Sequence, residues 1–180
     1  MAICNPTGSL SVTIREEIRL PNGNMEQSIN TKVITDVNQI MKRTDTIAPT
    51  FSGSGIEILR FVDSEEQQTA GSFVRDTVKY MRFTNLCSTN FLSLYLIQDS
   101  PEAQSPNTGN VGSGDESLFR LDAGKSMVFS NAQFQGTDYY DYVVEGYVDI
   151  QYFSSFASLS SIKAKADTAN VQIEYFVASS

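Results

Sequence analysis

The chain has no histidine and no tryptophan among its 180 residues, and it has only two cysteines. Histidine is the commonest general base and the commonest side-chain ligand of zinc, iron and copper. Its absence excludes Ser-His-Asp and Cys-His arrangements, and two cysteines cannot complete a structural zinc site. We therefore expect no enzymatic activity, no catalytic residues, no metal site and no cofactor.

The two cysteines, Cys4 and Cys87, show no C-x-x-C spacing, and the opening MAICNPTGSL lacks the features of a secretory leader. We expect both to be free thiols. No window approaches the ~18 consecutive apolar residues of a membrane span. These observations predict a protein made and folded in a cytoplasm, without membrane contact.

Basic residues are few and scattered. The chain has 13 of them against 21 acidic residues, for a net charge of −8, and only Lys42 and Arg43 are adjacent. Nucleic-acid binding relies on clustered Lys and Arg that face phosphates. The charge pattern therefore argues against a DNA or RNA partner and favours a solubilising surface.

Alternation with period two is the signal that recurs along the chain. From Ser9 to Leu20 the odd positions are polar, and the even positions are apolar except for Glu16. This pattern predicts a long strand with one buried face. The apolar row consists of Leu10, Val12, Ile14, Ile18 and Leu20. Pro21 to Asn24 have strong turn chemistry.

The same criteria predict further strands, two tight hairpins and little helix. The strands are expected at 26–35, 39–47, 55–62, 77–84, 91–98, 117–121, 126–130, 142–153, 158–166 and 170–178, and the hairpin turns at 85–90 and 122–125. The expected fold is all-β, an antiparallel β-sandwich or jelly roll of about ten strands. Residues 1–8 would form an N-terminal arm, and residues 9–180 a single domain with a long exposed loop at 99–117.

Two pairs of carboxylates are the strongest candidates for chemistry. Asp138 and Asp141 flank two tyrosines, and Glu145 and Asp149 share one face of a predicted strand. Glycoside hydrolysis needs only two such groups. A turn and a solvated strand edge are the favoured interpretation, because a glycosidase cleft usually has aromatic platforms and the chain has no tryptophan.

Calcium and phosphate motifs are weaker still. Asp115-Glu116 and the Asp138 and Asp141 pair offer oxygen ligands, but neither has EF-hand spacing. The GSG sequences at 53–55 and 112–114 do not join a strand to a helix, and no Gly-Lys-Ser/Thr occurs. Both are predicted to be loops.

The segment 134–153 is rich in aromatic side chains, with Phe134 and Phe153 at its ends. Two interpretations stay open, a protein interface and cross-strand packing with Tyr175 as a neighbour, and a sugar-binding surface is a third. The tyrosines of the segment are Tyr139, Tyr140, Tyr142, Tyr147 and Tyr152.

Three stretches carry a family resemblance: SLSVTIREEIRLPNG, TVKYMRFTNLCSTNFLSLYL and FRLDAGKSMVFSN. Across residues 9–130 the chain resembles small all-β virion structural proteins of tailed bacteriophages, particularly marine and cyanobacterial phages, such as capsid decoration (cement) proteins. The resemblance implies a non-enzymatic virion component that forms homo-oligomers, often trimers, and contacts other virion proteins such as the major capsid protein.

Two alternatives to a decoration protein remain. The first is a tail or fibre component. The second is a carbohydrate-binding or receptor-binding β-sandwich, in which Tyr139, Tyr140 and Tyr142 would stack on sugars beside Asp138 and Asp141.

Overall fold

The computed structural model describes residues 8–23, 25–49, 55–98, 116–130 and 159–180. In these ranges the chain is almost entirely strand, with two single-turn 3-10 helices, η1 (Glu65–Gln67) and η2 (Arg75–Thr77). The strands are β1 (Gly8–Arg19), β2 (Met25–Val37), β3 (Gln39–Ile47), β4 (Ile56–Val62), β5 (Ser72–Val74), β6 (Val78–Asn85), β7 (Leu92–Gln98), β8 (Glu116–Leu121), β9 (Ser126–Ser130), β10 (Leu159–Ala166) and β11 (Val171–Ser179).

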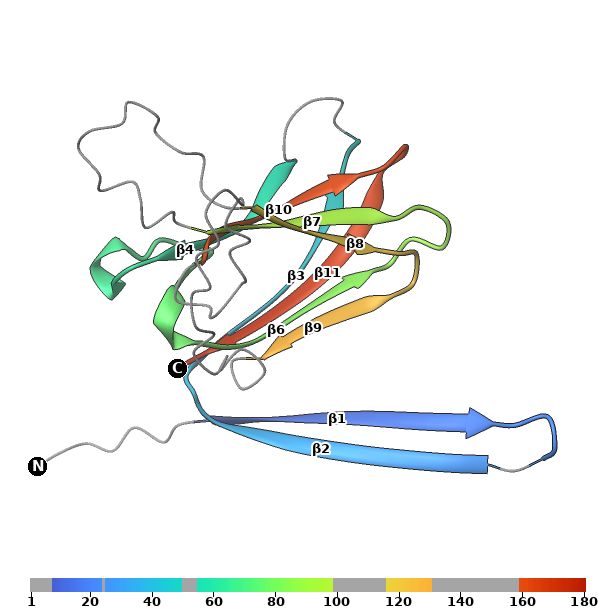
Figure 1. Ribbon diagram of the computed structural model, residues 1–180. Helices are drawn as coiled ribbons and strands as arrows, with labels where there is room; N and C mark the ends of the chain where they lie inside the picture. The colour runs from blue at the N-terminus through green and yellow to red at the C-terminus, as the bar shows by residue number, and fades with distance from the viewer. Residues whose placement is uncertain (1–7, 24, 50–54, 99–115, 131–158) are drawn as a thin grey trace, which may run out of the picture.

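Nine of these strands form two facing sheets (Figure 1). One sheet has the order β5-β4-β10-β7-β8, and the other has the order β3-β11-β6-β9. All neighbours are antiparallel except β4 and β5, which are parallel. The predicted all-β sandwich is therefore confirmed.

The core lies between the two sheets and follows from the alternation in the strands. In β7 every second residue is buried and the others are half-buried, and β11 has a similar pattern. Phe83, Tyr175 and Leu94 are completely inaccessible to solvent in this core. Burial of such side chains is the main favourable term in folding, at roughly 1.5–3 kcal/mol each.

Each sheet has an inner strand that comes late in the sequence. β11 lies between β3 and β6, and β10 lies between β4 and β7. Every pairing made by these two strands joins segments far apart in the chain, so the sandwich depends on long-range contacts.

Ten of the predicted strands are present, with ends that move by a few residues. The short strand Ser72–Val74 and the two 3-10 turns were not predicted, because three residues are too few to show a period. The long loop ends earlier than predicted, since β8 begins at Glu116. The predicted strand at 142–153, the N-terminal residues 1–7 and the remainder of the loop, 99–115, lie outside the described residues.

The two predicted tight hairpins are wrong. β6 and β7 belong to different sheets, and so do β8 and β9. The turn at 122–125 does form, with the Lys125 amide bonded to the Asp122 carbonyl at 3.1 Å and a φ of 67° at Gly124. Both connections are arches between the layers, because the strands on each side turn their apolar faces to the same core.

Asn85 holds the two arches together from a fully buried position. Its side-chain amide donates to the carbonyls of Asn90 (2.9 Å) and Leu121 (3.1 Å), and its side-chain oxygen accepts from the Cys87 amide at 2.9 Å. Its backbone N–H donates to the Lys125 carbonyl at 2.9 Å. One side chain thus satisfies polar groups of both connections.

Candidate functional site

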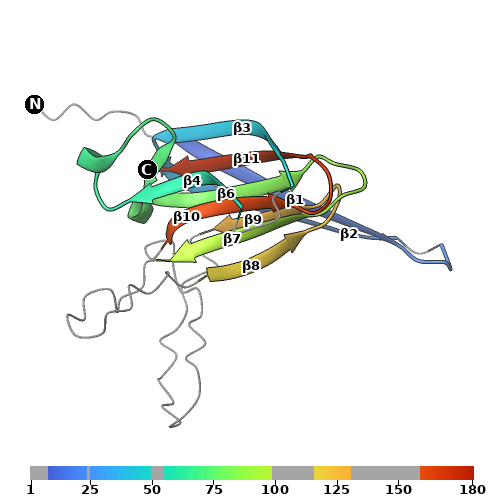
Figure 2. The ribbon, with the colours of Figure 1, turned by 90° about the horizontal axis from the view of Figure 1, so that it is seen from above.

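Strands β1 and β2 form a two-stranded sheet of their own. We call this hairpin the arm (residues 8–37), as distinct from the N-terminal arm predicted at residues 1–8. The arm passes beside the four-stranded sheet and continues beyond it (Figures 1 and 2). The turn at its tip has the Gly23 amide bonded to the Leu20 carbonyl at 3.0 Å, in the predicted position. Twelve residues of β1 at about 3.3 Å each give a length of about 40 Å.

The base of the arm is fixed to the sandwich. Leu10 and Val12 pack against a small cluster that includes Tyr80 and Ala178 on the outer face of the four-stranded sheet. The Lys79 ammonium donates to the Thr35 carbonyl at 3.0 Å. The chain then leaves the arm through Asp36, whose φ is 57°, a left-handed conformation that aspartate tolerates better than most residues.

Beyond its base the arm exposes large apolar side chains. The expected buried face of residues 9–20 is therefore wrong, since only Leu10 and Val12 are half-buried there. The reason is that β1 pairs with β2 alone, and among the described residues nothing covers the distal half. Six of the eleven exposed large apolar side chains described belong to the arm: Ile14, Ile18, Leu20, Met25, Ile29 and Val33.

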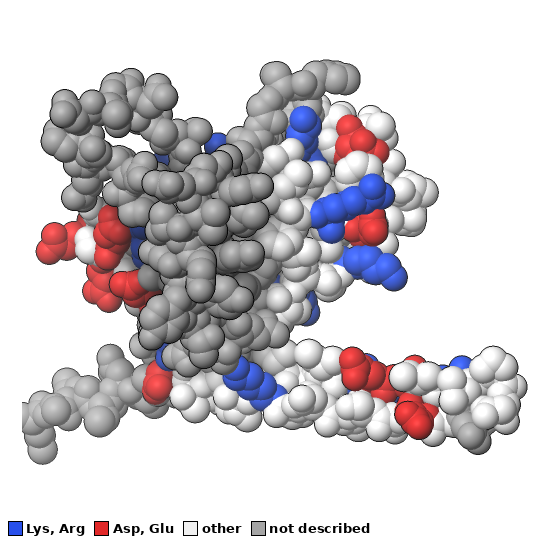
Figure 3. Space-filling view, in the orientation of Figure 1, with Lys and Arg blue, Asp and Glu red and all other residues white. Residues whose placement is uncertain are grey.

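The strand register assigns the side chains of the arm to two faces, and it places Met25, Ile29 and Val33 on the face opposite to Ile14 and Ile18. Ile18 is opposite Glu26, and Glu16 is opposite Ser28, so these residues share the face that carries Leu10 and Val12 at the base. Figure 3 shows the arm as mostly uncharged, with red carboxylates and a smaller area of blue basic groups on its distal half. The tip of this face is thus both apolar and acidic.

A groove, which we call the arm groove, lies between the arm and the outer face of the four-stranded sheet. It consists of two adjoining hollows, of about 460 Å³ and about 190 Å³. Val12 and Ile14 line both hollows on the side of the arm. Tyr80 and Val128 line both on the side of the sheet.

Among the described residues, the charged side chains that line the arm groove are all basic: Lys32, Lys42 and Arg82. Glu174 lies next to them and forms ion pairs with Lys42 (3.0 Å) and Arg82 (2.5 Å). The hydrogen bond from Lys42 and the two positive charges hold the pKa of Glu174 below its ordinary value, against the opposing effect of partial burial. Glu174 is therefore ionised at neutral pH. Its single negative charge is smaller than the charge of the three basic side chains, so the groove has a net positive charge.

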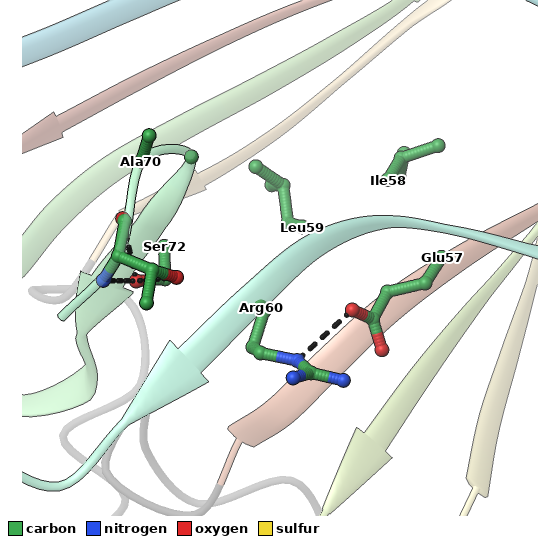
Figure 4. Close-up of a pocket in the computed structure, with 8 residues that line it drawn as sticks. Glu57, Ile58, Leu59, Arg60, Ala70 and Ser72 are labelled. Atoms are coloured by element: carbon green, nitrogen blue, oxygen red, sulfur yellow. Dashed lines mark hydrogen bonds and ion pairs between the residues drawn. The ribbon is translucent and has the colours of Figure 1, made fainter. Parts of the chain in front are cut away.

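A second depression, of about 330 Å³, lies beside β4 and β5 (Figure 4). Its polar groups are bound to one another. Glu57 pairs with Arg60 at 3.0 Å, and the Ser72 hydroxyl donates to the Thr69 carbonyl at 2.9 Å.

Comparisons with known proteins found no relative of this chain. No family model matches the chain, and no match was found among curated proteins or solved structures. Within the described ranges, no group of three or more Cys, Asp or Glu could hold a metal ion, and no helix is long and apolar enough to cross a membrane.

Most candidate residues from the sequence lie outside the described part of the chain. Glu116 is the first residue of β8, and Gly55 precedes β4. The candidates outside the described residues are Asp115, Asp138, Asp141, Glu145, Asp149, both ends of the aromatic segment and all its tyrosines, and the GSG at 112–114. The predictions that concern them stay predictions.

Of the two cysteines, Cys87 is described, and its thiol is free as predicted. Hydrogen bonds from Thr89 and Asn90 to the sulfur lower its pKa to about 7. This sulfur helps to order the 86–91 arch, since the Asn90 amide donates to it at 3.4 Å.

Tyr175 is fully buried in the core and is not part of a surface platform. Its ring stacks on Phe83 with centroids 6.4 Å apart, and its hydroxyl donates to the Asp45 carboxylate at 2.5 Å. Burial, helped by the hydrogen bond to Asp45 and its negative charge, raises the pKa of Tyr175 well above its usual value.

Replacing Tyr175 by Phe should lower the free energy of unfolding by about 1 kcal/mol at pH 7, because the bond to Asp45 is lost. The raised pKa gives this tyrosine a stabilising effect that is complete below pH ~10 and is lost as pH rises, since the unfolded state ionises first. The difference between wild type and Tyr175→Phe should therefore shrink above pH 10. Urea denaturation at pH 7, 9, 10 and 11 measures it, and a difference that stays constant to pH 11 would contradict the assignment.

Proposed function

We propose that this chain is a non-enzymatic structural component of a tailed-phage virion, a capsid decoration (cement) protein that acts through protein–protein contacts. It would form a homo-oligomer, with a trimer as the expected state, and bind other virion proteins such as the major capsid protein. Neither nucleic acid nor membrane is a partner in this proposal.

The observation that carries the proposal is the arm. Large exposed apolar patches on soluble proteins usually mark interaction sites. Here the apolar side chains lie on a hairpin whose base packs on the sandwich and whose distal half extends beyond it, where no described residue covers it. A two-stranded hairpin is at best marginally stable alone in water. The arm is therefore best explained as a segment that is covered when the protein meets its partner.

Two further observations support a structural role. The resemblance in residues 9–130 is to virion structural proteins, and all three of its stretches contribute to the arm or to its groove, through β1, β6 and β9. The polar groups of the described depression are paired with each other, as expected of a scaffold.

The test is whether the protein is part of a particle. Phage particles produced with a C-terminally tagged copy of the chain should contain it after density-gradient purification, as measured by mass spectrometry. Immunogold labelling of the tag should mark the head. Label on the tail would support the alternative tail or fibre role, and purified particles that lack the chain would contradict the proposal.

A further inference from the structure

We propose that the arm tip of one copy docks in the arm groove of a second copy, so that copies of this chain assemble head to tail. The docking face of the tip contains Glu16, Ile18 and Glu26, with Leu20 at the turn. This inference rests on the proposed function and deepens it, because it names the surfaces by which the subunits would contact each other.

Continuity along the arm is the first argument for a second copy as the occupant. Within one chain, Leu10 and Val12 already pack on the outer face of the four-stranded sheet. Ile14 and Ile18 follow on the same face of β1 at the same two-residue spacing or a multiple of it, and each is 54% exposed. The outer face of the four-stranded sheet therefore already binds the apolar face of β1, and this apolar face extends further along the arm than the sheet of the same chain covers.

Charge is the second argument. The groove is lined by three basic side chains, and in the part of the chain that the structure describes Glu174 is the carboxylate that pairs with two of them. The docking face of the tip carries Glu16 and Glu26. Opposite charges on the two surfaces favour their association and fix its register, whereas a like-charged partner would be rejected.

The arm cannot satisfy this contact within its own chain. Ile14 lines the groove, and Ile18 lies four residues further out, about 13 Å along an extended strand. β1 and β2 are paired without interruption over this length, so the tip cannot fold back. A tip-to-groove contact between different surfaces is heterologous, and it closes into a ring when the rotation between copies permits.

The experiment exchanges the charges of the two surfaces. An arm variant carries Glu16→Lys and Glu26→Lys. A groove variant carries Lys32→Glu, Lys42→Glu, Arg82→Glu and Glu174→Lys, so that the groove becomes acidic while the ion pairs within the chain are kept with reversed polarity. A control variant, Glu65→Lys with Glu66→Lys, changes the net charge as the arm variant does, at exposed positions on η1.

The wild type and the control should be oligomeric by light scattering and analytical ultracentrifugation. Each charge-reversed variant alone should dissociate, with a dissociation constant raised by about 100-fold or more through like-charge contacts. The two variants mixed should associate again, because each arm then meets a groove of opposite charge. Capture of one untagged variant by the other, tagged variant reads this out, and melting temperatures confirm that both variants are folded.

A monomeric wild type at all concentrations up to about 100 µM would overturn the inference, and so would variants that fail to associate when mixed. Particle binding is a separate measurement. A monomer that is still found in purified particles would leave the proposed function standing and would assign the arm to another virion protein. A stable, charge-dependent oligomer that is absent from particles would support the contact between arm and groove and would contradict the proposed function.

Discussion

Replacing Phe83 by Ala is expected to lower the free energy of unfolding by about 3–5 kcal/mol, the usual range for a buried phenylalanine. Phe83 is completely inaccessible to solvent in β6, in the middle of the sandwich core. Its ring meets Phe129 edge to face at 6.1 Å and stacks on Tyr175 at 6.4 Å. The alanine leaves a cavity that these two rings cannot fill without losing contacts elsewhere.

Urea denaturation followed by circular dichroism measures this change. Phe83→Leu is the matched control, and because it keeps most of the volume it should lose only about 1–1.5 kcal/mol. Domains of this kind have a total stability of about 5–15 kcal/mol, so the alanine variant should also show a clearly lower melting temperature. A loss below about 1 kcal/mol for Phe83→Ala would show that this side chain is not in a packed core.

Replacing Asn85 by Ala is expected to lower the free energy of unfolding by about 3 kcal/mol. The change removes three hydrogen bonds, each with a net worth of about 1 kcal/mol, and leaves buried backbone groups without partners. Asn85→Asp should be at least as damaging, because it places an oxygen where the amide now donates to two carbonyls.

Asn170→Ala, at an exposed position before β11, is the matched control and should change stability by less than about 0.5 kcal/mol. Both arches should loosen in the Asn85 variants. Hydrogen exchange at residues 86–91 and 122–125 would show it as faster exchange in both segments at once. Loosening of only one arch would mean that Asn85 does not couple them.

The sequence predicted the strands well because alternation is a local property. In β7 the leucines Leu92, Leu94 and Leu96 recur at every second position, and the sandwich buries all three. The partners of each strand were not predictable in the same way. A turn such as Asp122–Lys125, with its glycine in a left-handed conformation, serves a hairpin and an arch equally well, so the choice depends on which faces the rest of the chain covers.

The arm shows the same limit for the candidate site. The even positions of residues 9–20 correctly indicated a strand with one apolar face, but a row of apolar residues does not specify which molecule covers it. The groove was missed because its basic residues come from three strands. Lys32, Lys42 and Arg82 are isolated or nearly isolated cations in the sequence, and only the pairing of β3, β11 and β6 brings Lys42 and Arg82 to the same glutamate.

The inner position of β10 and β11 in their sheets also sets the order in which a growing chain can fold. β3 and β6 have no partner between them until Val171–Ser179 has been made, and β4 and β7 likewise wait for Leu159–Ala166. The arm needs only residues close together in sequence, so it can pair long before the sandwich does. Domains dominated by such distant pairings fold in about milliseconds to seconds, and a ribosome bearing an unfinished chain would present four unpaired strand edges to its surroundings.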